Sequence, residues 1–375
     1  MFLRAYEPLE KHLEVGKALV IFGPRRTGKT TILQQFLKKT HKRYKLDSGD
    51  NIRVRDILGS QDFSRIISYL EGYDIYAIDE AQNIPSIGMA LKIIVDQCPN
   101  MQVVVTGSSS FELAGQIGEP LTGRKKTFIL YPMSQLELLQ SYNRFELTEG
   151  LSDFLVFGSY PEVLTASTYN KKKELLYELT QSYLLKDILA FDKIKHSRTL
   201  LDLLMLLAYQ IGNEVSLNEL ATKLNIDVKT VQRYLDLLEK TFVIIRFNGF
   251  SRNLRDEVTN KAKYYFIDTG IRNALINQFN PLDMRNDQGA LWENFMQVER
   301  IKYRTYKGMY AHSYFWRTYQ QQEIDLIEEY EGKLHAFEFK WSSKKQVRPP
   351  KTWSTAYPDA DYKVITPENY QSIIL

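Results

Sequence analysis

Residues 18–30 read Ala-Leu-Val-Ile-Phe-Gly-Pro-Arg-Arg-Thr-Gly-Lys-Thr, an apolar run that leads directly into the pattern G-x-x-x-x-G-K-T. Residues 31–37 follow with apolar side chains at helical spacing, so this stretch predicts a buried strand, a loop and a helix in succession. Backbone N–H groups of such a loop, together with the N-terminus of the helix, bind phosphate groups. The sequence therefore predicts a nucleotide site, with Lys29 on the outer phosphates and the Thr30 hydroxyl on Mg²⁺.

Two carboxylates follow the third predicted strand, which comes after strands at 18–22 and 43–47. Residues 73–80, Tyr-Asp-Ile-Tyr-Ala-Ile-Asp-Glu, end in Asp79 and Glu80. Ligands bind at the C-terminal ends of the strands in open α/β sheets, so both side chains are expected beside the phosphate loop. Asp79 is the second predicted Mg²⁺ ligand, and Glu80 is the predicted base that orients and deprotonates the attacking water.

The next two predicted strands add further candidates. Residues 101–110 end in Thr106 and Ser108, whose hydroxyls either sense the terminal phosphate or cap the following helix. Arg124 lies at the entrance of a strand at 121–130. Its guanidinium either neutralises charge on the transferred phosphoryl group, in this subunit or in a neighbouring one, or is a solvated surface group. The predicted nucleotide-binding residues are Gly23, Pro24, Arg25, Arg26, Thr27, Gly28, Lys29, Thr30, Thr31, Asp79, Thr106 and Ser108.

Length and composition set the broad class of the chain. Strands that alternate with helices indicate an α/β fold with a doubly wound parallel sheet, and 375 residues suit two or three domains. The net charge of +4 is a weak clue to any partner, and the single cysteine, Cys98, excludes an intramolecular disulfide. We see no secretory signal and no apolar run long enough for a membrane span, so we expect a cytoplasmic location and no membrane partner.

A helix-turn-helix is predicted in the second half of the chain. Residues 216–238 form two short helical patterns around the polar turn Asn225-Ile226-Asp227, and residues 243–247 and 263–267 are expected to form a wing hairpin. Acidic residues leave the second helix close to neutral, so a packing role fits as well as a role in DNA binding. In a DNA-binding version the groove-facing residues would be Lys229, Thr230, Gln232 and Arg233.

A second constellation of chemical groups lies near the C-terminus. Asp325 and Glu338 fall on two predicted hairpin strands, and Lys340 points to the same face as Glu338. With Glu293 on an upstream predicted helix, these residues resemble the D…E-x-K core of restriction-type nucleases. In such a core Asp325 and Glu338 would hold Mg²⁺ and activate water for phosphodiester cleavage. The alternative is that Glu338 and Lys340 only pair across a strand face.

Residues 301–320 carry four basic and no acidic side chains, interleaved with aromatic ones. Basic groups attract phosphates and aromatic rings stack on unpaired bases, so a nucleic-acid surface is one interpretation. The other is that the aromatic residues belong to the core of a sheet.

These motifs resemble those of a known family. The segments GPRRTGKT (23–30), IDE (78–80), TGSSS (106–110) and LTGRKKTFILYPMSQLE (121–137) are similar to prokaryotic AAA-type ATPases that carry a C-terminal DUF4143 domain. Residues 157–162 and 185–188 resemble the helical connector of that family. The resemblance implies a P-loop ATPase core at 1–132, a helical lid or connector at 133–207, a winged helix-turn-helix at 208–270 and a restriction-endonuclease-like, PD-(D/E)XK domain at 271–375.

Two classes of function compete at this point. The first is an ATPase that uses ATP and Mg²⁺ to drive or gate the engagement of nucleic acid, DNA above all, by the winged helix and a C-terminal domain that could cut it. The second is an ATP-gated regulatory module whose inactive nuclease-like domain docks a protein partner. A protein-remodelling ATPase is a third possibility. In ring-forming relatives a neighbouring subunit supplies such an arginine. If Arg124 acts in this way, the chain forms a homo-oligomer, which is a further expectation.

Overall fold

The structure of the chain is a computed structural model that describes residues 2–108, 120–184, 197–251, 261–342 and 347–375. Residues 109–110 of the TGSSS motif and the predicted connector residues 185–188 lie outside these ranges. The chain divides into two compact units. The N-terminal unit comprises Leu3–Pro132 and Lys240–Phe242, and the C-terminal unit comprises Phe2, Met133–Glu239 and Val243–Leu375. Within the described ranges, no helix has the length and apolar character needed to cross a bilayer.

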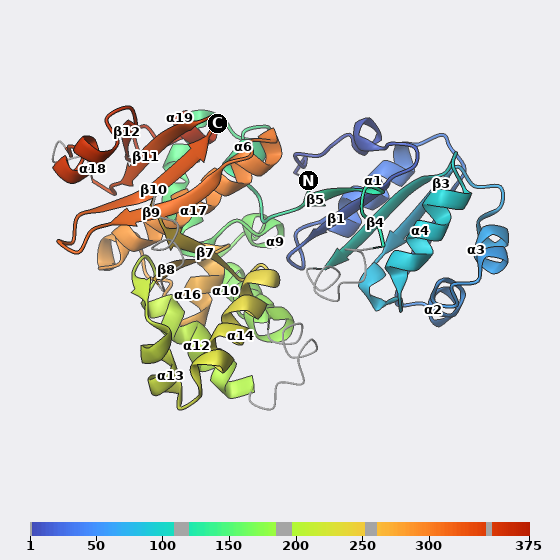
Figure 1. The fold of residues 1–375 in the computed structure, drawn as a ribbon, viewed down its shortest axis with the longest axis horizontal. Helices are drawn as coiled ribbons and strands as arrows, with labels where there is room; N and C mark the ends of the chain where they lie inside the picture. Colours follow the sequence, from blue (N-terminus) through green and yellow to red (C-terminus); the bar gives the residue numbers. More distant parts are fainter. Residues whose placement is uncertain (1, 109–119, 185–196, 252–260, 343–346) are drawn as a thin grey trace. The chain divides into compact units, whose positions relative to one another are not determined.

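The N-terminal unit is built on a five-stranded parallel sheet with the order β2-β3-β4-β1-β5, which confirms the predicted α/β class. The strands are β1 (Ala18–Gly23), β2 (Tyr44–Ser48), β3 (Ile75–Asp79), β4 (Gln102–Ser108) and β5 (Lys125–Ile129). The helices are α1 (Lys29–Lys39), α2 (Ile52–Gly59), α3 (Phe63–Leu70) and α4 (Ile87–Gln97), with short 3-10 turns η1 (Leu9–His12) and η2 (Ala81–Asn83). Figure 1 shows α4 on one face of this sheet and α1 on the other.

Strand β1 occupies an inner position of the sheet because all six of its residues are apolar or glycine and all are buried. It pairs with β4 on one side and with β5 on the other. Alternate residues point to opposite faces, and Val20 and Phe22 pack in one cluster with Leu91 and Ile94 of α4. Each such buried side chain stabilises the unit by roughly 1.5–3 kcal/mol before entropy is counted. Because β1, β3 and β4 run parallel, their carboxyl ends lie at the same edge of the sheet.

The C-terminal unit begins with short helices and continues into a mixed α/β arrangement. The first helices are α6 (Gln135–Leu138), α7 (Arg144–Glu149), α8 (Leu151–Phe157), α9 (Pro161–Leu164), α10 (Tyr169–Glu178), the π-helical turn η3 (Leu179–Leu184) and α12 (Ser197–Tyr209). The later ones are α13 (Leu217–Leu224), α14 (Val228–Lys240), α16 (Thr269–Leu275), η4 (Leu282–Met284), α17 (Gln288–Lys307), α18 (Lys351–Ala356) and α19 (Gln371–Ile374). Helix α17 is the longest of these, and its Trp292 and Met296 are fully buried.

A seven-stranded sheet runs through the C-terminal unit with the order β12-β11-β10-β9-β7-β8-β6. Its strands are β6 (Glu214–Val215), β7 (Ile244–Gly249), β8 (Ala262–Phe266), β9 (His312–Arg317), β10 (Glu323–Tyr330), β11 (Lys333–Phe339) and β12 (Asp361–Ile365). Strands β7 and β8 form an antiparallel hairpin close to the positions that the sequence predicts. Strand β7 also pairs in parallel with β9, which joins the hairpin to the C-terminal strands in one sheet.

Two of the predicted domain boundaries do not separate compact units. The boundary after residue 132 coincides with the division between the two units, whereas those after 207 and 270 fall inside the C-terminal unit. The boundary at 270 would divide β7 and β8 from β9, although β7 and β9 are neighbours in the sheet. Their pairing sets Gly249 beside Phe315, and no local sequence pattern records a contact between segments so far apart.

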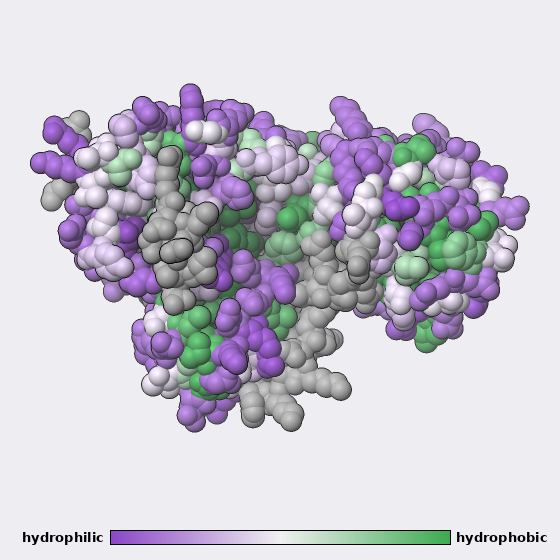
Figure 2. Space-filling view, in the orientation of Figure 1, coloured by the Kyte–Doolittle hydropathy of each residue, from purple (hydrophilic) through white to green (hydrophobic). Residues whose placement is uncertain are grey.

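Apolar side chains on the surface are scattered. In Figure 2 the visible face of each unit is mostly hydrophilic, with smaller apolar patches between the polar residues. In the N-terminal unit, Ile52 and Phe63 at the starts of α2 and α3 are 68% and 52% exposed. Single exposed apolar residues of this kind are normal on folded proteins, so they indicate no particular function.

Candidate functional site

The phosphate loop joins β1 to α1 and is closed on itself. Gly23 and Gly28 have φ angles of +144° and +93°, which residues with a Cβ atom rarely adopt. The Lys29 ammonium donates to the carbonyl oxygens of Gly23 at 2.9 Å and Pro24 at 2.7 Å. The Thr27 hydroxyl donates to the same Pro24 oxygen at 2.9 Å. Lys29 is only 6% exposed, so its side chain lies folded against the loop that it is predicted to serve.

The remaining loop residues lie around this turn. Arg25 and Arg26 are half-buried, with Arg26 at a φ of +57°, and Thr31 is exposed in the first turn of α1. The loop is braced by Arg4, a buried residue that the sequence did not indicate. Its guanidinium donates to the carbonyl oxygen of Thr27 and, at 2.7 Å, to that of Tyr131. No motif contains Arg4, so only its contacts identify its role.

Asp79 connects three elements at the carboxyl edge of the sheet. Its Oδ2 atom accepts a hydrogen bond from the Thr30 hydroxyl at 2.8 Å, and its Oδ1 atom accepts one from the Thr106 hydroxyl. Thr30 lies in the first turn of α1, Asp79 ends β3 and Thr106 lies on β4. The structure therefore places a hydroxyl and a carboxylate side by side, which is the ligand pair that nucleotide-bound Mg²⁺ uses in P-loop proteins.

Glu80 follows Asp79 with a φ of +50°, and a bridging side chain contacts it. The Gln82 amide nitrogen donates to Glu80 Oε2, and Gln82 Oε1 accepts from the Ser108 N–H at 3.3 Å. Ser108 is buried at the end of β4, so Gln82 links the predicted base to a second strand of the sheet. Sequence reasoning missed Gln82. The available signal was an amide two residues after the carboxylate pair, which η2 turns back toward Glu80.

Arg124 lies at the opposite edge of the same sheet. It directly precedes β5, and its carbonyl oxygen accepts from the Ala18 N–H at 2.8 Å, at the start of β1. Its guanidinium pairs with Asp96 at 2.6 Å. Because the phosphate loop follows the other end of β1, about 17 Å of strand separates the two. The structure thus does not bring Arg124 to the phosphate loop of its own subunit, and a role on a neighbouring copy stays a prediction.

The second predicted constellation forms a carboxylate cluster in the C-terminal unit, which we define as Glu293, Glu323, Asp325 and Glu338. Glu293 lies on α17, Glu323 and Asp325 on β10, and Glu338 on β11. The β10–β11 ladder pairs Leu326 with Phe337, so Asp325 lies across from Glu338. Asp325 Oδ2 accepts from the Phe339 N–H at 2.7 Å, and Lys340 pairs with Glu338 Oε1. Glu293, Asp325, Glu338 and Lys340 are therefore brought together as the sequence suggested, since Asp325 interacts electrostatically with the other three.

A lysine that sequence reasoning placed only on a hairpin strand contacts this cluster. Lys263 on β8 is 1% exposed, and its Nζ atom lies 2.9 Å from Glu293 Oε1 and also contacts Glu323 Oε1. Tyr265, two residues further along β8, donates its hydroxyl to the same Glu293 oxygen at 2.5 Å. Residues i and i+2 point to one face of a strand, so β8 presents both groups to the cluster. In the sequence, this arrangement is indicated only by the positions of Lys263 and Tyr265, which are two residues apart on a predicted strand and therefore share a face.

Burial and neighbouring charges shift the protonation of these groups. Burial, with the Glu293 and Glu338 carboxylates close by, raises the pKa of Asp325 well above its ordinary value. Burial also raises the pKa of Glu338, against the opposing effect of a lysine. Burial alone would lower the pKa of Lys263, but the Glu293, Glu323 and Asp325 carboxylates raise it by more. The cluster therefore holds Lys263 as an ammonium ion and favours a proton on Asp325.

The predicted Mg²⁺ on Asp325 and Glu338 does not fit this arrangement. Across the described part of the chain, no three His, Cys, Asp or Glu side chains are placed to hold a metal ion together. Glu293 Oε1 pairs with Lys263 and Glu338 Oε1 with Lys340, so two ammonium groups already neutralise these carboxylates. Glu338 Oε2 is buried, and none of the described residues donates a hydrogen bond to it. The physical reason for the difference is the lysine of β8, which the D…E-x-K pattern does not include.

The residues considered for nucleic-acid contact differ in exposure. Lys229, Gln232 and Arg233 are exposed on α14, whereas the Thr230 hydroxyl donates to Asp227 at 2.6 Å. In residues 301–320 the side chains of Lys302 and Arg304 are buried, and they pair with Glu299 at 2.8 Å and Glu328 at 3.2 Å. Half of the basic side chains of this region are thus neutralised inside the unit, which favours the core interpretation of its pattern.

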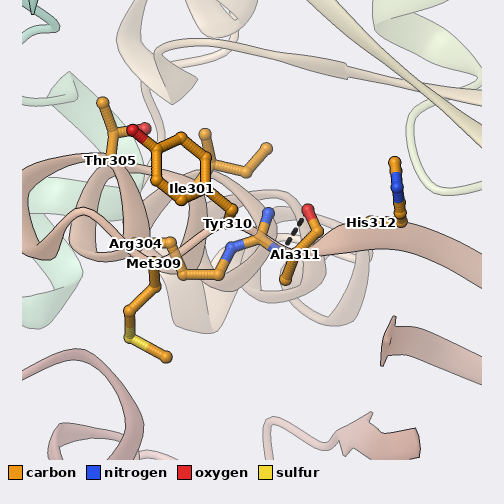
Figure 3. A pocket seen from close by; sticks show the side chains of 7 residues that line it. All are labelled: Ile301, Arg304, Thr305, Met309, Tyr310, Ala311 and His312. Carbon is orange, nitrogen blue, oxygen red and sulfur yellow. Dashed lines mark hydrogen bonds between the residues drawn. The ribbon is translucent and has the colours of Figure 1, made fainter. Parts of the chain in front are cut away.

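A hollow of about 310 Å³ lies where α17 leads into β9, and Figure 3 shows the side chains around it. The Arg304 guanidinium, which the hollow exposes in part, donates to the Ala311 carbonyl oxygen at 3.4 Å and to the Ser313 hydroxyl at 2.6 Å. These contacts hold both terminal nitrogens of the guanidinium within the unit, and the hollow carries no functional assignment. It is lined by Ile301, Arg304, Thr305, Met309, Tyr310, Ala311 and His312.

Family models match three consecutive parts of the chain. Residues 15–139 match an AAA domain, and residues 288–372 match the domain of unknown function DUF4143. The chain carries an AAA domain and a DUF4143 domain. This confirms the resemblance to an AAA-type domain followed by a DUF4143 domain, while the winged helix and the restriction-endonuclease-like character stay predictions. Residues 148–282, between the AAA domain and the DUF4143 domain, match a further domain of unknown function, DUF8612.

The relatives that match most of the chain are named as uncharacterized proteins. Protein Rv2008c of Mycobacterium tuberculosis is 27% identical over 344 residues, which cover 90% of this chain and 74% of that protein. A protein of Haemophilus influenzae is 26% identical over 283 residues, which cover 69% of each chain. Protein MJ1544 of Methanocaldococcus jannaschii is 25% identical over 313 residues, which cover 78% of this chain and 68% of that protein.

Solved structures align at low scores. A RuvB variant from Thermotoga maritima aligns with a TM-score of 0.30 and 16% identity, covering 61% of this chain and 82% of that one. A signal transduction ATPase with numerous domains from Pyrococcus horikoshii aligns with a TM-score of 0.28 and 12% identity, covering 76% of this chain and 43% of that one. The strand order β2-β3-β4-β1-β5 and the phosphate loop before α1 define the fold of the AAA domain.

Proposed function

We propose that the AAA domain binds ATP with Mg²⁺ and hydrolyses it. The observation that carries this proposal is the contact between the Thr30 hydroxyl and the Asp79 carboxylate, 2.8 Å apart, beside the phosphate loop, whose backbone has positive φ angles at Gly23 and Gly28. The match of residues 15–139 to an AAA domain supports it. Thr106 and Ser108 at the end of β4 complete the edge at which the phosphates would lie.

In this proposal each group has a separate task. The N–H groups of residues 23–30 and the N-terminus of α1 bind the phosphates, and Lys29 exchanges its carbonyl partners for phosphate oxygens. Thr30 and Asp79 hold Mg²⁺, which when bound neutralises charge that develops on the phosphates. Glu80 orients the attacking water and accepts its proton, while Gln82 fixes the position of the Glu80 carboxylate.

The test compares three variants of the full chain. We expect Lys29→Ala to weaken ATP binding about 10- to 100-fold, because a charge-assisted contact to phosphate is lost. We expect Glu80→Gln to bind ATP like the parent and to lower turnover about 100-fold or more, because the base is lost. Lys39→Ala, an exposed lysine at the other end of α1, is the matched control and leaves both unchanged. Calorimetric titration and phosphate release measure the two quantities, and parent-like turnover in both site variants would refute the assignment.

We further propose that α13 and α14 engage DNA as the helix-turn-helix of a winged helix. Support comes from the order of elements, with the β7–β8 hairpin after α14, and from three exposed polar side chains on α14, those of Lys229, Gln232 and Arg233. The interpretation that this module docks a protein partner instead is the alternative outcome of the test.

The test measures binding of a short DNA duplex by fluorescence anisotropy at several salt concentrations. The joint Lys229→Ala and Arg233→Ala variant is expected to reduce the slope of log affinity against log salt by about two, because two phosphate contacts are removed. Lys223→Ala is the matched control, since Lys223 pairs with Glu219 at 2.6 Å on α13. An unchanged slope in the double variant, or no binding by the parent at low salt, would contradict a role in DNA engagement.

A further inference from the structure

We propose that Lys263 is the resident cation of the carboxylate cluster, so that this cluster is a buried ionic joint between β8, α17 and β10 and not a metal centre. The proposal does not depend on the function of the AAA domain. It explains why the side chains at the cluster differ from the D…E-x-K core that they resemble. The difference is Lys263, which the pattern does not include.

The first argument is the position of the Lys263 ammonium group. It lies 2.9 Å from Glu293 Oε1 and contacts Glu323 Oε1, which come from a helix and a strand on other parts of the chain. The ring of Phe315 on β9 is 5.6 Å from the same nitrogen. Since the lysine is 1% exposed, water does not replace these partners. A charged amine buried to this extent is stable only where carboxylates surround it, and here they do.

The second argument is the inventory of charge around the cluster. Its four carboxylates face the ammonium groups of Lys263 and Lys340, and Arg317 lies 3.7 Å from Glu323. A divalent cation placed among these carboxylates would meet the buried ammonium group of Lys263. To contact Glu293 Oε1, the cation would have to displace this ammonium group, which is 1% exposed.

The third argument is the carboxylate oxygen without a donor. Glu338 Oε2 is the atom that a metal ion would be expected to contact, because none of the described residues hydrogen-bonds to it. The other oxygen of this carboxylate, Oε1, pairs with the Lys340 ammonium group. Asp325, the other predicted ligand, uses Oδ2 to accept the Phe339 N–H at 2.7 Å. The two carboxylates therefore have partners that need no metal ion.

The experiment counts Mn²⁺ ions bound by the full chain without nucleotide, using electron paramagnetic resonance. The parent and Asp325→Asn are expected to bind the same number, because the cluster holds no metal and any ion at the AAA domain is common to both. Lys263→Met is expected to bind one Mn²⁺ more than the parent, and the added Asp325→Asn change is expected to abolish that gain. Lys261→Met is the matched control, because Lys261 is exposed on the same segment and pairs with Glu214 at 2.9 Å.

A Mn²⁺ ion that the parent binds and Asp325→Asn loses would overturn the proposal, and so would Mg²⁺-dependent DNA nicking by the parent that Asp325→Asn abolishes. If Lys263→Met does not fold, the numbers of Mn²⁺ ions bound by the parent and by Asp325→Asn still show whether the cluster holds a metal ion. Lys263→Arg keeps the positive charge, so it is expected to fold and to bind no additional Mn²⁺. An additional ion bound by Lys263→Arg would also count against the ammonium group as the resident cation.

Discussion

At the residue scale, the contact between Gln82 and Glu80 has a direct kinetic consequence. Gln82 holds one carboxylate oxygen of Glu80 and at the same time accepts the Ser108 N–H, so it positions the proposed base without touching the phosphates. We predict that Gln82→Ala lowers kcat for ATP hydrolysis about tenfold, a part of the 100-fold or more that a general base contributes. KM for ATP is expected to change by less than about twofold, because ground-state binding does not use this contact. Steady-state phosphate release measures both constants.

Asn83 provides the matched control for this prediction. It is the next residue in η2, but its amide donates to Asp50 at 2.8 Å on the exposed side. Asn83→Ala should therefore leave kcat and KM unchanged. A raised KM with an unchanged kcat in Gln82→Ala would show that Gln82 acts on nucleotide binding instead of on the base.

The sequence predicts the positions of those nucleotide-site residues that lie at or near the end of a strand. Asp79 ends β3 and Thr106 lies two residues before the end of the parallel strand β4, so the topology places both near the Thr30 hydroxyl, and the structure brings the three together. Arg4 and Lys263 were not predictable as site residues, because they reach their partners across distances in the chain that periodicity does not encode.

At the scale of elements, helix α16 closes the end of helix α8. The Asn273 amide donates to the Leu155 and Val156 carbonyl oxygens at 3.0 and 2.8 Å, and the Thr269 hydroxyl donates to Phe154 O at 2.9 Å. The Asn273 amide thus satisfies two of the carbonyl groups that the last turn of a helix leaves without an intrahelical partner, while Phe154 O also accepts from the Gly158 N–H at 2.9 Å. The two helices approach so closely because Gly158 and Gly270 lie at the junction.

We predict that Gly158→Ala destabilises the C-terminal unit by about 3 kcal/mol or more. Gly158 has a φ of +72° and a ψ of −160°, a region that is essentially restricted to glycine. An added Cβ would also overlap the Asp268 carboxylate, which accepts the Ser159 N–H at 2.7 Å. Urea unfolding monitored by tryptophan fluorescence gives the free energy of unfolding of both proteins.

Gly289→Ala is the control substitution within the same unit. Gly289 lies in the first turn of α17, with open space where a Cβ would be placed. Alanine is a better helix former, so this change should be neutral or stabilise the unit by up to about 1 kcal/mol. Equal losses of stability in the two variants would show that the cost is not specific to the α8–α16 junction.

The elements of the N-terminal sheet were largely predictable, because each strand is a short apolar run followed by polar residues. The strand expected at 121–130 is shorter, since Gly123 has a φ of +75° and β5 begins only at Lys125. In the C-terminal unit the β7–β8 hairpin was predictable from its two apolar runs. The parallel pairing of β7 with β9 was not, because it depends on a contact between distant segments.

At the scale of the whole molecule, the two units have separate hydrophobic cores. One cluster contains Val20, Phe22 and Leu91, and the other contains Phe154, Trp292 and Phe337. We predict two unfolding transitions in differential scanning calorimetry, of which ATP with Mg²⁺ stabilises only one. At 100 times its Kd, the nucleotide should stabilise that unit by about 2.7 kcal/mol. The Glu80→Gln variant is suited to this measurement because it is expected to bind without turnover.

Lys29→Ala is the control for the calorimetric prediction, because at the same nucleotide concentration it should show both transitions and a stabilisation of only about 0.4 to 1.4 kcal/mol. A single transition that moves as a whole on adding nucleotide would mean that the two units unfold cooperatively and would contradict the prediction. Gly158→Ala assigns the two transitions to the two units. It should lower the midpoint temperature of only the transition that nucleotide does not shift, which is that of the C-terminal unit.

The shared sheet of the C-terminal unit also dictates how the protein can be dissected for expression. A piece that stops at residue 270 would retain β7 but lose β9, and the row of unpaired backbone groups left on Asn248 and Gly249 would invite intermolecular pairing and precipitation. Trimming after residue 132 avoids that edge, but it removes Phe242, whose ring lies 5.7 Å from that of Phe22 and 6.1 Å from that of Tyr131. A recombinant piece that carries the AAA domain would consequently have to keep residues 240–242 or expose these two rings to solvent.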